Sequence, residues 1–187
     1  MKVLIGEDET LIRLDLRTML ERAGHDIVGE ASTGEEAVEL ARSAAPELAI
    51  MDVKMPALDG IEAARRILAE RPIPVVIVSA YTEEALVGRA AEAGVFGYLA
   101  KPFREEDLLP AIATAQARFA ELAHVRETAD SLADALAARK AIERAKGILM
   151  QKQGLTEEAA FARLRKASQS SGRPMRLIAE AVIETFA

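Results

Sequence analysis

The sequence predicts an α/β unit built on a five-stranded parallel sheet, followed by an all-α unit. Short apolar runs alternate with amphipathic stretches over about the first 120 residues, which is typical of strands covered by helices on both faces. From Ala111 to Lys146 there is neither Gly nor Pro, and this favours one long helix. The remaining residues show helical periodicity and no strand-like run.

Five strands and five helices are expected to alternate in the α/β unit. The strands are predicted at residues 3–6, 26–30, 48–52, 74–79 and 95–99, and 74–79 is the most β-branched of them. The helices are predicted at residues 10–23, 33–45, 60–71 and 82–93, and from about 104, with Thr10 capping the first. We expect the flavodoxin-like strand order 2-1-3-4-5, because it sets the ends of the first and third strands side by side.

An apolar stripe follows the α/β unit along the long helix. Leu122, Val125, Ala129, Leu132 and Leu136 have the 3-4-3-4 spacing of a coiled-coil seam. The alternative is an amphipathic helix that packs on its own domain. The stripe restarts one residue early at Ile142, so we expect the helix to leave a partner chain there and enter a new core.

The C-terminal residues predict a three-helix unit. Gly154 ends the long helix, Thr156 caps the next one, and Pro174 suits the first turn of the last. The inner faces are predicted to be Phe161, Leu164, Ala167 and Ser168, and then Leu177, Ile178, Ala181, Val182 and Phe186. We therefore divide the chain into 1–120, a helical linker at 121–138, and 139–187.

The charges of these parts differ. Residues 1–120 carry 13 basic and 21 acidic side chains, whereas residues 139–176 carry ten basic and three acidic ones. An overall net charge of −6 argues against indiscriminate nucleic-acid binding by the whole molecule. The asymmetry predicts two modules with different partners.

Several other classes are excluded by composition. The chain has no cysteine, so it has no disulfide, thiolate metal site or cysteine nucleophile. Glu7 follows the first apolar run too closely for a signal peptide, and no apolar run is long enough to span a bilayer. We expect a cytoplasmic protein without a membrane partner.

Chemically active side chains end four of the predicted strands. Glu7 and Asp8 follow the first, Asp52 closes the third, Ser79 the fourth, and Lys101 follows the fifth. Three carboxylates at one sheet edge repel one another unless a cation shares them, and their oxygens suit Mg²⁺. A hydroxyl and an ammonium group bind phosphoryl oxygens, so Asp52 is the candidate nucleophile of an aspartyl phosphate. The alternative is that these residues are helix caps and surface charges.

In this order, the residues resemble the receiver family of response regulators over residues 1 to about 120. The motifs are the acidic pair, Asp52 with Met-Pro-x-x-Asp-Gly after it, Ser-Ala after the fourth strand, and Tyr-x-x-Lys-Pro-Phe at the fifth. The resemblance implies that Mg²⁺ is bound by Glu7, Asp8, Asp52 and the backbone carbonyl of Lys54. It implies that a sensor histidine kinase phosphorylates Asp52, that Ser79 and Lys101 bind the phosphoryl oxygens, and that Tyr98 follows the state of Ser79. Tyr81 and Lys54 are expected beside the pocket.

The tail resembles the ANTAR domain over about 139–187. The matching positions are 145–150 (AKGILM), 154–161 (GLTEEAAF), Leu164-Arg165, Ala167-Ser168 and Ile178-Ala179. The resemblance implies RNA binding and transcription antitermination, with hairpins of the nascent transcript as targets. The candidate RNA contacts are Lys140, Arg144, Lys146, Arg163, Arg165, Lys166, Arg173 and Arg176. Gly172 and Pro174 depart from the family, which often carries Asn and a longer polar side chain there.

Together these patterns predict a phosphorylation-controlled RNA-binding response regulator that pairs as a homodimer when phosphorylated. One alternative is a receiver whose helical output binds a protein partner or DNA, although the last helix is too apolar after Arg176 for a DNA reader. A second alternative is a hydrolase that uses Asp52 as nucleophile. Such an enzyme needs a second acid two residues later, where the chain has Lys54, so we expect a phosphoacceptor and not an enzyme.

Overall fold

The computed structural model describes residues 1–80 and 84–186. Tyr81, which was expected beside the pocket, lies outside them. Contacts divide the chain into two compact units, Met1–Leu122 and Ala123–Ala187, and each is described by itself. Within the described residues, no helix is both long and apolar enough to cross a membrane.

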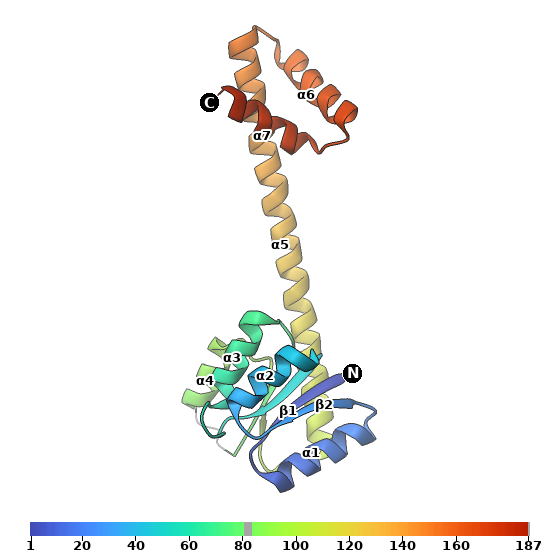
Figure 1. The fold of residues 1–187 in the computed structure, drawn as a ribbon, viewed down its shortest axis with the longest axis vertical. Helices are drawn as coiled ribbons and strands as arrows, with labels where there is room; N and C mark the ends of the chain where they lie inside the picture. The colour runs from blue at the N-terminus through green and yellow to red at the C-terminus, as the bar shows by residue number, and fades with distance from the viewer. Residues whose placement is uncertain (81–83, 187) are drawn as a thin grey trace. The chain divides into compact units, whose positions relative to one another are not determined.

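The first unit is built on a five-stranded parallel sheet (Figure 1). Its strands are β1 (Lys2–Gly6), β2 (Asp26–Ala31), β3 (Leu48–Asp52), β4 (Val75–Ser79) and β5 (Gly97–Ala100). They lie in the order β2-β1-β3-β4-β5, so the predicted flavodoxin-like fold is confirmed. β3 and β4 are buried along their whole length, which explains why both read as continuous apolar runs.

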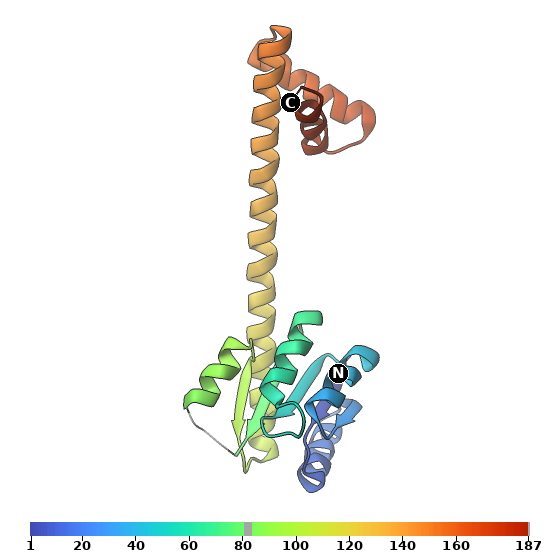
Figure 2. The ribbon, with the colours of Figure 1, turned by 60° about the vertical axis from the view of Figure 1, so that its left-hand side comes forward.

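Helices cover both faces of the sheet. One face packs against α2 (Gly34–Ala44), α3 (Gly60–Glu70) and α4 (Glu84–Glu92). The other packs against α1 (Thr10–Arg22) and the first turns of α5 (Glu105–Gln153), as Figures 1 and 2 show. Buried Leu, Ile, Val, Met and Ala side chains on the strands and helices form these two cores, and each fully buried Leu or Ile stabilises the fold by about 1.5–3 kcal/mol.

Capping side chains fix two of these helix starts. Thr33 accepts a hydrogen bond from the Glu36 amide at the start of α2, and Asp59 accepts one from the Glu62 amide at the start of α3. The predicted cap by Thr10 is wrong, because Glu9 occupies the N-cap position of α1 and its side chain makes no capping bond. The start predicted for the fourth helix, at Thr82, lies outside the described residues.

α5 is a single helix from Glu105 to Gln153. It includes every residue of the predicted seam, namely Leu122, Val125, Ala129, Leu132 and Leu136. The four large side chains among them are 38% to 67% exposed, and none belongs to a core cluster of the described chain. The stripe therefore remains uncovered.

The second unit adds α6 (Glu157–Ser171) and α7 (Met175–Phe186) to the end of α5. As predicted, Gly154 ends α5, and its left-handed φ of 66° favours glycine. Thr156 caps α6 by accepting a hydrogen bond from the Ala159 amide. Pro174 lies just before α7 rather than within its first turn.

The predicted inner faces of α6 and α7 are partly wrong. The core consists of Ala145, Leu149, Ala160, Leu164 and Ala179, whereas Phe161, Leu177 and Phe186 are 42%, 50% and 39% exposed. Ala160 and Leu164 are one turn apart and define the buried stripe of α6. This stripe lies one residue away from Phe161, whose ring is consequently moved toward solvent.

Candidate functional site

The sheet edge gathers the predicted acidic residues with one lysine. Carboxylate oxygens of Glu7, Asp8 and Asp52 all lie within 4.8 Å of one another. The Nζ atom of Lys101 lies 2.7 Å from an oxygen of Glu7 and 3.2 Å from an oxygen of Asp52. Glu7 and Asp52 are buried while Asp8 is exposed, so the cluster opens to solvent on the side of Asp8.

The loop after β3 is held tightly behind Asp52. The Gly60 amide donates to the Val53 carbonyl at 3.0 Å, and a Cβ atom on Gly60 would lie 1.8 Å from the Asp52 carbonyl oxygen. Asp59 caps α3 by accepting from the Glu62 amide, and it also accepts a hydrogen bond from Arg89 of α4 at 2.8 Å. The Asp-Gly pair of the motif therefore closes the loop, and Asp59 ties it to α4.

Burial governs the electrostatics of this pocket. It raises the pKa of the Asp52 carboxyl above its usual value, although the ammonium group of Lys101 acts in the opposite direction. Burial also raises the pKa of Glu7 and outweighs its hydrogen bond from Lys101. Burial opposes the charge of Lys101 as well, but its pairs with Glu7 and Asp52 prevail and raise its pKa.

These shifts give the pocket a pH-dependent cost in stability. As the pH rises from the ordinary carboxyl pKa through the raised pKa values of Glu7 and Asp52, these two carboxyl groups stay protonated to a higher pH in the folded chain than in the unfolded chain. The free energy of unfolding therefore falls over that window. A cation that neutralises the carboxylates removes this cost, and the three hard oxygens suit Mg²⁺.

The remaining predicted pocket residues lie at the same edge. A cavity of about 370 Å³ is lined by Asp8, Glu9, Asp52, Lys54, Ser79, Ala80 and Lys101. Ser79 is buried at the end of β4 and pairs in register with Ala100. Tyr98 lies two residues before Ala100 on β5 and packs against the core, so it shares its side of the sheet with Ser79.

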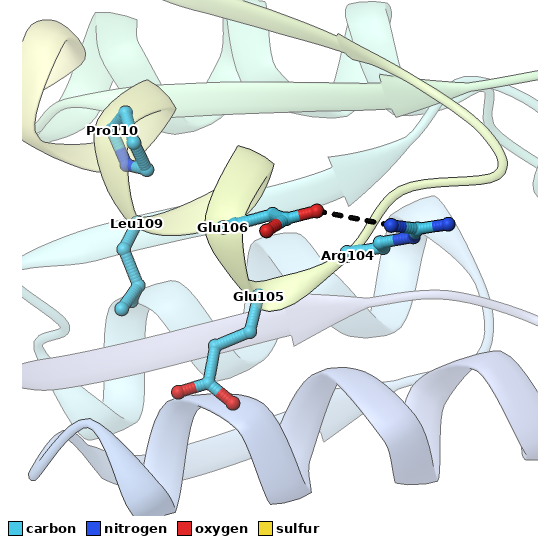
Figure 3. A pocket seen from close by; sticks show the side chains of 5 residues that line it. All are labelled: Arg104, Glu105, Glu106, Leu109 and Pro110. Atoms are coloured by element: carbon cyan, nitrogen blue, oxygen red, sulfur yellow. Dashed lines mark hydrogen bonds and ion pairs between the residues drawn. The ribbon is translucent and has the colours of Figure 1, made fainter.

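A cavity of about 660 Å³, larger than the cavity around Asp52, lies at the start of α5 (Figure 3). Arg104, Glu105, Glu106, Leu109 and Pro110 line it, and Arg104 pairs with Glu106 at 3.1 Å. These side chains offer neither a nucleophile nor a convergent set of carboxylates. The smaller pocket around Asp52 is therefore the candidate site.

The second unit places most candidate RNA contacts on its surface. Lys140 and Arg144 are exposed one turn apart on α5, and Arg165 and Lys166 are exposed on α6. Arg173, in the α6–α7 connection, is also exposed.

Three other candidate RNA contacts are already paired within this unit. Arg163 donates to Gln153 at 2.6 Å, and Arg176 pairs with Glu180 and with Asp134 of α5. Lys146 is buried, and its Nζ atom lies 3.0 Å from Glu143 and 2.7 Å from Glu157.

Ion pairs between separate elements have no signal in the local sequence. Lys146 joins α5 to the first turn of α6, Arg176 joins α7 to Asp134 of α5, and Arg89 of α4 pairs with Asp59. The Glu143–Lys146 spacing of three residues and the Arg176–Glu180 spacing of four were visible as helical pairs. Lys146 is buried and paired with two carboxylates, so it is less accessible than the exposed candidate RNA contacts.

Two family models match the chain. The response regulator receiver domain matches residues 3–113, and the ANTAR domain matches residues 130–183. The transcriptional regulatory protein PdtaR of Mycobacterium tuberculosis is 48% identical over 185 residues, which cover 99% of this chain and 90% of that protein. The response regulator GacA of Pseudomonas aeruginosa is 39% identical over 113 residues, which cover 59% and 53% of the two chains.

Solved structures match the first unit. A signal receiver domain of a modulated diguanylate cyclase from Desulfovibrio desulfuricans superposes with a TM-score of 0.59 at 36% identity, covering 63% of this chain and 94% of that one. A CheY-like receiver domain protein from Methanospirillum hungatei gives a TM-score of 0.60 at 26% identity, covering 64% and 96%. Both likenesses support a receiver fold for the first unit.

Proposed function

The chain belongs to the response regulators that join a receiver domain to an ANTAR domain, and on this premise we propose that phosphorylation of Asp52 by a sensor histidine kinase controls RNA binding by its helical unit. The observation that carries the proposal is the convergence of Glu7, Asp8 and Asp52, with Lys101 between two of them.

The broader function follows from the two matched domains. The protein is a response regulator that acts in RNA-based antitermination, and it is a regulator rather than a catalyst. An output that binds DNA or a protein partner is not favoured by these matches. We propose residues 1–120 as the phosphoacceptor module, 121–138 as the linker and 139–187 as the RNA-binding module.

We infer the following transfer step. An oxygen of the Asp52 carboxylate attacks the phosphorus atom of the kinase's phosphohistidine, the P–N bond breaks, and the imidazole nitrogen leaves with the electron pair. Lys101 then exchanges its contact with Asp52 for a phosphoryl oxygen, and the Ser79 hydroxyl donates to another. Tyr98 lies on the same side of the sheet as Ser79, and its side chain changes rotamer when Ser79 moves toward the phosphoryl group.

The proposed metal ligands are Glu7, Asp8, Asp52 and the backbone carbonyl of Lys54. When bound, Mg²⁺ supplies positive charge that offsets the charge of the carboxylates and the phosphoryl group. The raised pKa values of Glu7 and Asp52 support this ligand set, because they reflect charges that the protein alone stabilises poorly.

We expect Asp8→Ala to weaken Mg²⁺ binding while leaving the fold as stable as before or more stable. One oxygen ligand is lost, which should cost at least about 10-fold in affinity. Besides burial, the charge of Asp8 raises the pKa of Asp52, so its removal also relieves repulsion. Calorimetric titration with Mg²⁺ and thermal unfolding without Mg²⁺ measure the two effects.

Glu9→Ala is the matched control for the metal. Glu9 is also exposed and lines the same cavity, but it is outside the carboxylate cluster. This variant should bind Mg²⁺ as the parent does. Equal Mg²⁺ affinity in Asp8→Ala and the parent would contradict the proposed ligand set.

The RNA-binding face is tested by Lys140→Ala with Arg144→Ala. Both side chains are exposed on one side of α5, so each should contact a phosphate. Their loss should weaken binding to RNA hairpins and reduce the slope of log affinity against log salt by about 0.7 to 0.9 per contact. Filter binding over a salt series measures both quantities.

Arg118→Ala with Arg126→Ala removes the same charge from α5 outside the ANTAR match. This control should leave the salt slope unchanged. If the parent binds duplex DNA as tightly as RNA hairpins, the assignment of RNA as the target fails. If both double variants change the salt slope equally, Lys140 and Arg144 do not form a specific RNA-binding face.

We further propose that phosphorylation favours a homodimer along the seam Leu122–Leu136. Asp134 lies two residues from Leu132 and from Leu136, and so on the opposite side of the helix. There it pairs with Arg176 of α7 at 3.0 Å. α7 thus packs away from the seam, which leaves the exposed stripe available to a second copy.

A further inference from the structure

We propose that the Phe161 ring is a stacking platform for one unpaired base of the bound RNA. The inference rests on the proposed RNA binding of the helical unit and names a contact within it. It arises from the observed exposure of Phe161, which the apolar pattern of α6 had assigned to the core.

The position of Phe161 is fixed by its neighbours. Ala160 and Leu164 are 0% and 1% exposed and hold α6 against α5 and α7. The Phe161 side chain, by contrast, is 42% exposed. A ring that is partly packed on a rigid helix loses little conformational entropy when a base stacks on it. This favours affinity for RNA.

Positive charge lies along the same side of α6. Arg165 is one turn after Phe161, so the two side chains are neighbours, and Ser168 continues this side at the next turn. The Ser168 hydroxyl donates to the Arg173 carbonyl at 2.6 Å, which brings the exposed Arg173 to the end of the row. Phe161 therefore begins a row whose two arginines can contact the phosphates beside a stacked base.

The chemistry of this row fits RNA better than an apolar protein surface. Unpaired RNA bases stack on aromatic side chains, and the phosphates that flank them need cations. Phe186, the other aromatic residue of the unit, offers a contrast. It is 39% exposed in the last turn of α7, next to Glu184 and beyond the last basic residue of the chain.

The experiment uses the full chain and RNA hairpins that share one stem and carry randomised loops. Phe161→Leu keeps an apolar side chain but removes the ring, and it should weaken hairpin binding by about 5-fold to 150-fold, the effect of losing one stacked base. Phe161→Tyr keeps an aromatic ring and should bind the hairpin as the parent does. Phe186→Leu should bind as the parent does, and thermal unfolding checks that each variant is folded.

A spectroscopic readout reports stacking directly. The chain has no tryptophan, so Phe161→Trp introduces a single one, and its fluorescence should be quenched by saturating hairpin. The fluorescence of Phe186→Trp should not change. The fluorescence of Phe161→Trp should be quenched equally with the phosphorylated and the unphosphorylated protein, because stacking of a base on this residue does not require a dimer.

Three results would overturn the proposal. Equal hairpin affinity of the folded Phe161→Leu variant and the parent is the first. The second is weaker binding without quenching of Phe161→Trp, together with a loss of dimer in sedimentation, which would make Phe161 a contact between protein chains. Failure of the parent itself to bind any hairpin is the third, and it would also remove the proposed RNA function.

Discussion

Asp52→Asn is expected to abolish labelling of the protein by acetyl phosphate in the presence of Mg²⁺. The amide keeps the shape of the side chain but lacks the anionic oxygen that attacks phosphorus. Lys101 keeps its 2.7 Å contact with Glu7 in the variant, so the pocket should remain assembled. Because burial raises the pKa of Asp52, the neutral side chain should also leave the fold at least as stable at neutral pH. Phosphate incorporation and thermal unfolding measure the two results.

Asp59→Asn is the matched control for this experiment. Asp59 lies in the same loop, and Asn is an equally good N-cap for α3, so labelling should persist. Full labelling of Asp52→Asn, or labelling that survives acid treatment in that variant, would show that another residue accepts the phosphate.

Leu132→Asp with Leu136→Asp is expected to prevent the dimer that we propose phosphorylation favours. Both residues are exposed in the seam, at 67% and 53%, and pairing would bury two unpaired carboxylates from each chain at a high cost. Labelling at Asp52 should be intact. RNA affinity should fall by about 10²-fold to 10⁴-fold, since two linked binding units gain that much from effective concentration. Analytical ultracentrifugation with and without acetyl phosphate measures the mass.

His124→Asp with Ser131→Asp adds two carboxylates on the side of α5 away from the seam, so this control should still pair. A different mechanism would be required if the parent shows no mass change on phosphorylation while its RNA binding still rises. Phosphorylation would then control RNA binding by exposing the basic face of a single chain, and the seam would have another role.

The receiver pocket was predictable from sequence because its geometry follows from the backbone. Continuous apolar runs specify buried parallel strands, and parallel strands bring their carboxyl ends to one edge. Asp52 closes β3, and Lys101 comes directly after β5. No side-chain detail is needed to bring such residues together.

The helical unit was less predictable, because its faces depend on the rotation of each helix. A rotation of one residue, about 100°, separates the buried Ala160 from the exposed Phe161. Both residues are apolar, so the pattern alone does not distinguish them. Packing against α5 and α7 makes the choice.

The sequence by itself determined the two modules and the alternation of strands and helices, because periodicity and turn chemistry are local properties of a chain. The strand order and the acidic pocket followed from a further rule, that parallel strands bring their carboxyl ends to one edge of the sheet. Only the tertiary structure decided that Lys146 is buried and paired with Glu157, that Arg176 pairs with Asp134 and that Phe161 is exposed. It also decided that burial raises the pKa of Asp52. Each of these depends on side chains from separate helices or strands meeting at distances of a few ångströms, where ion pairing and desolvation act.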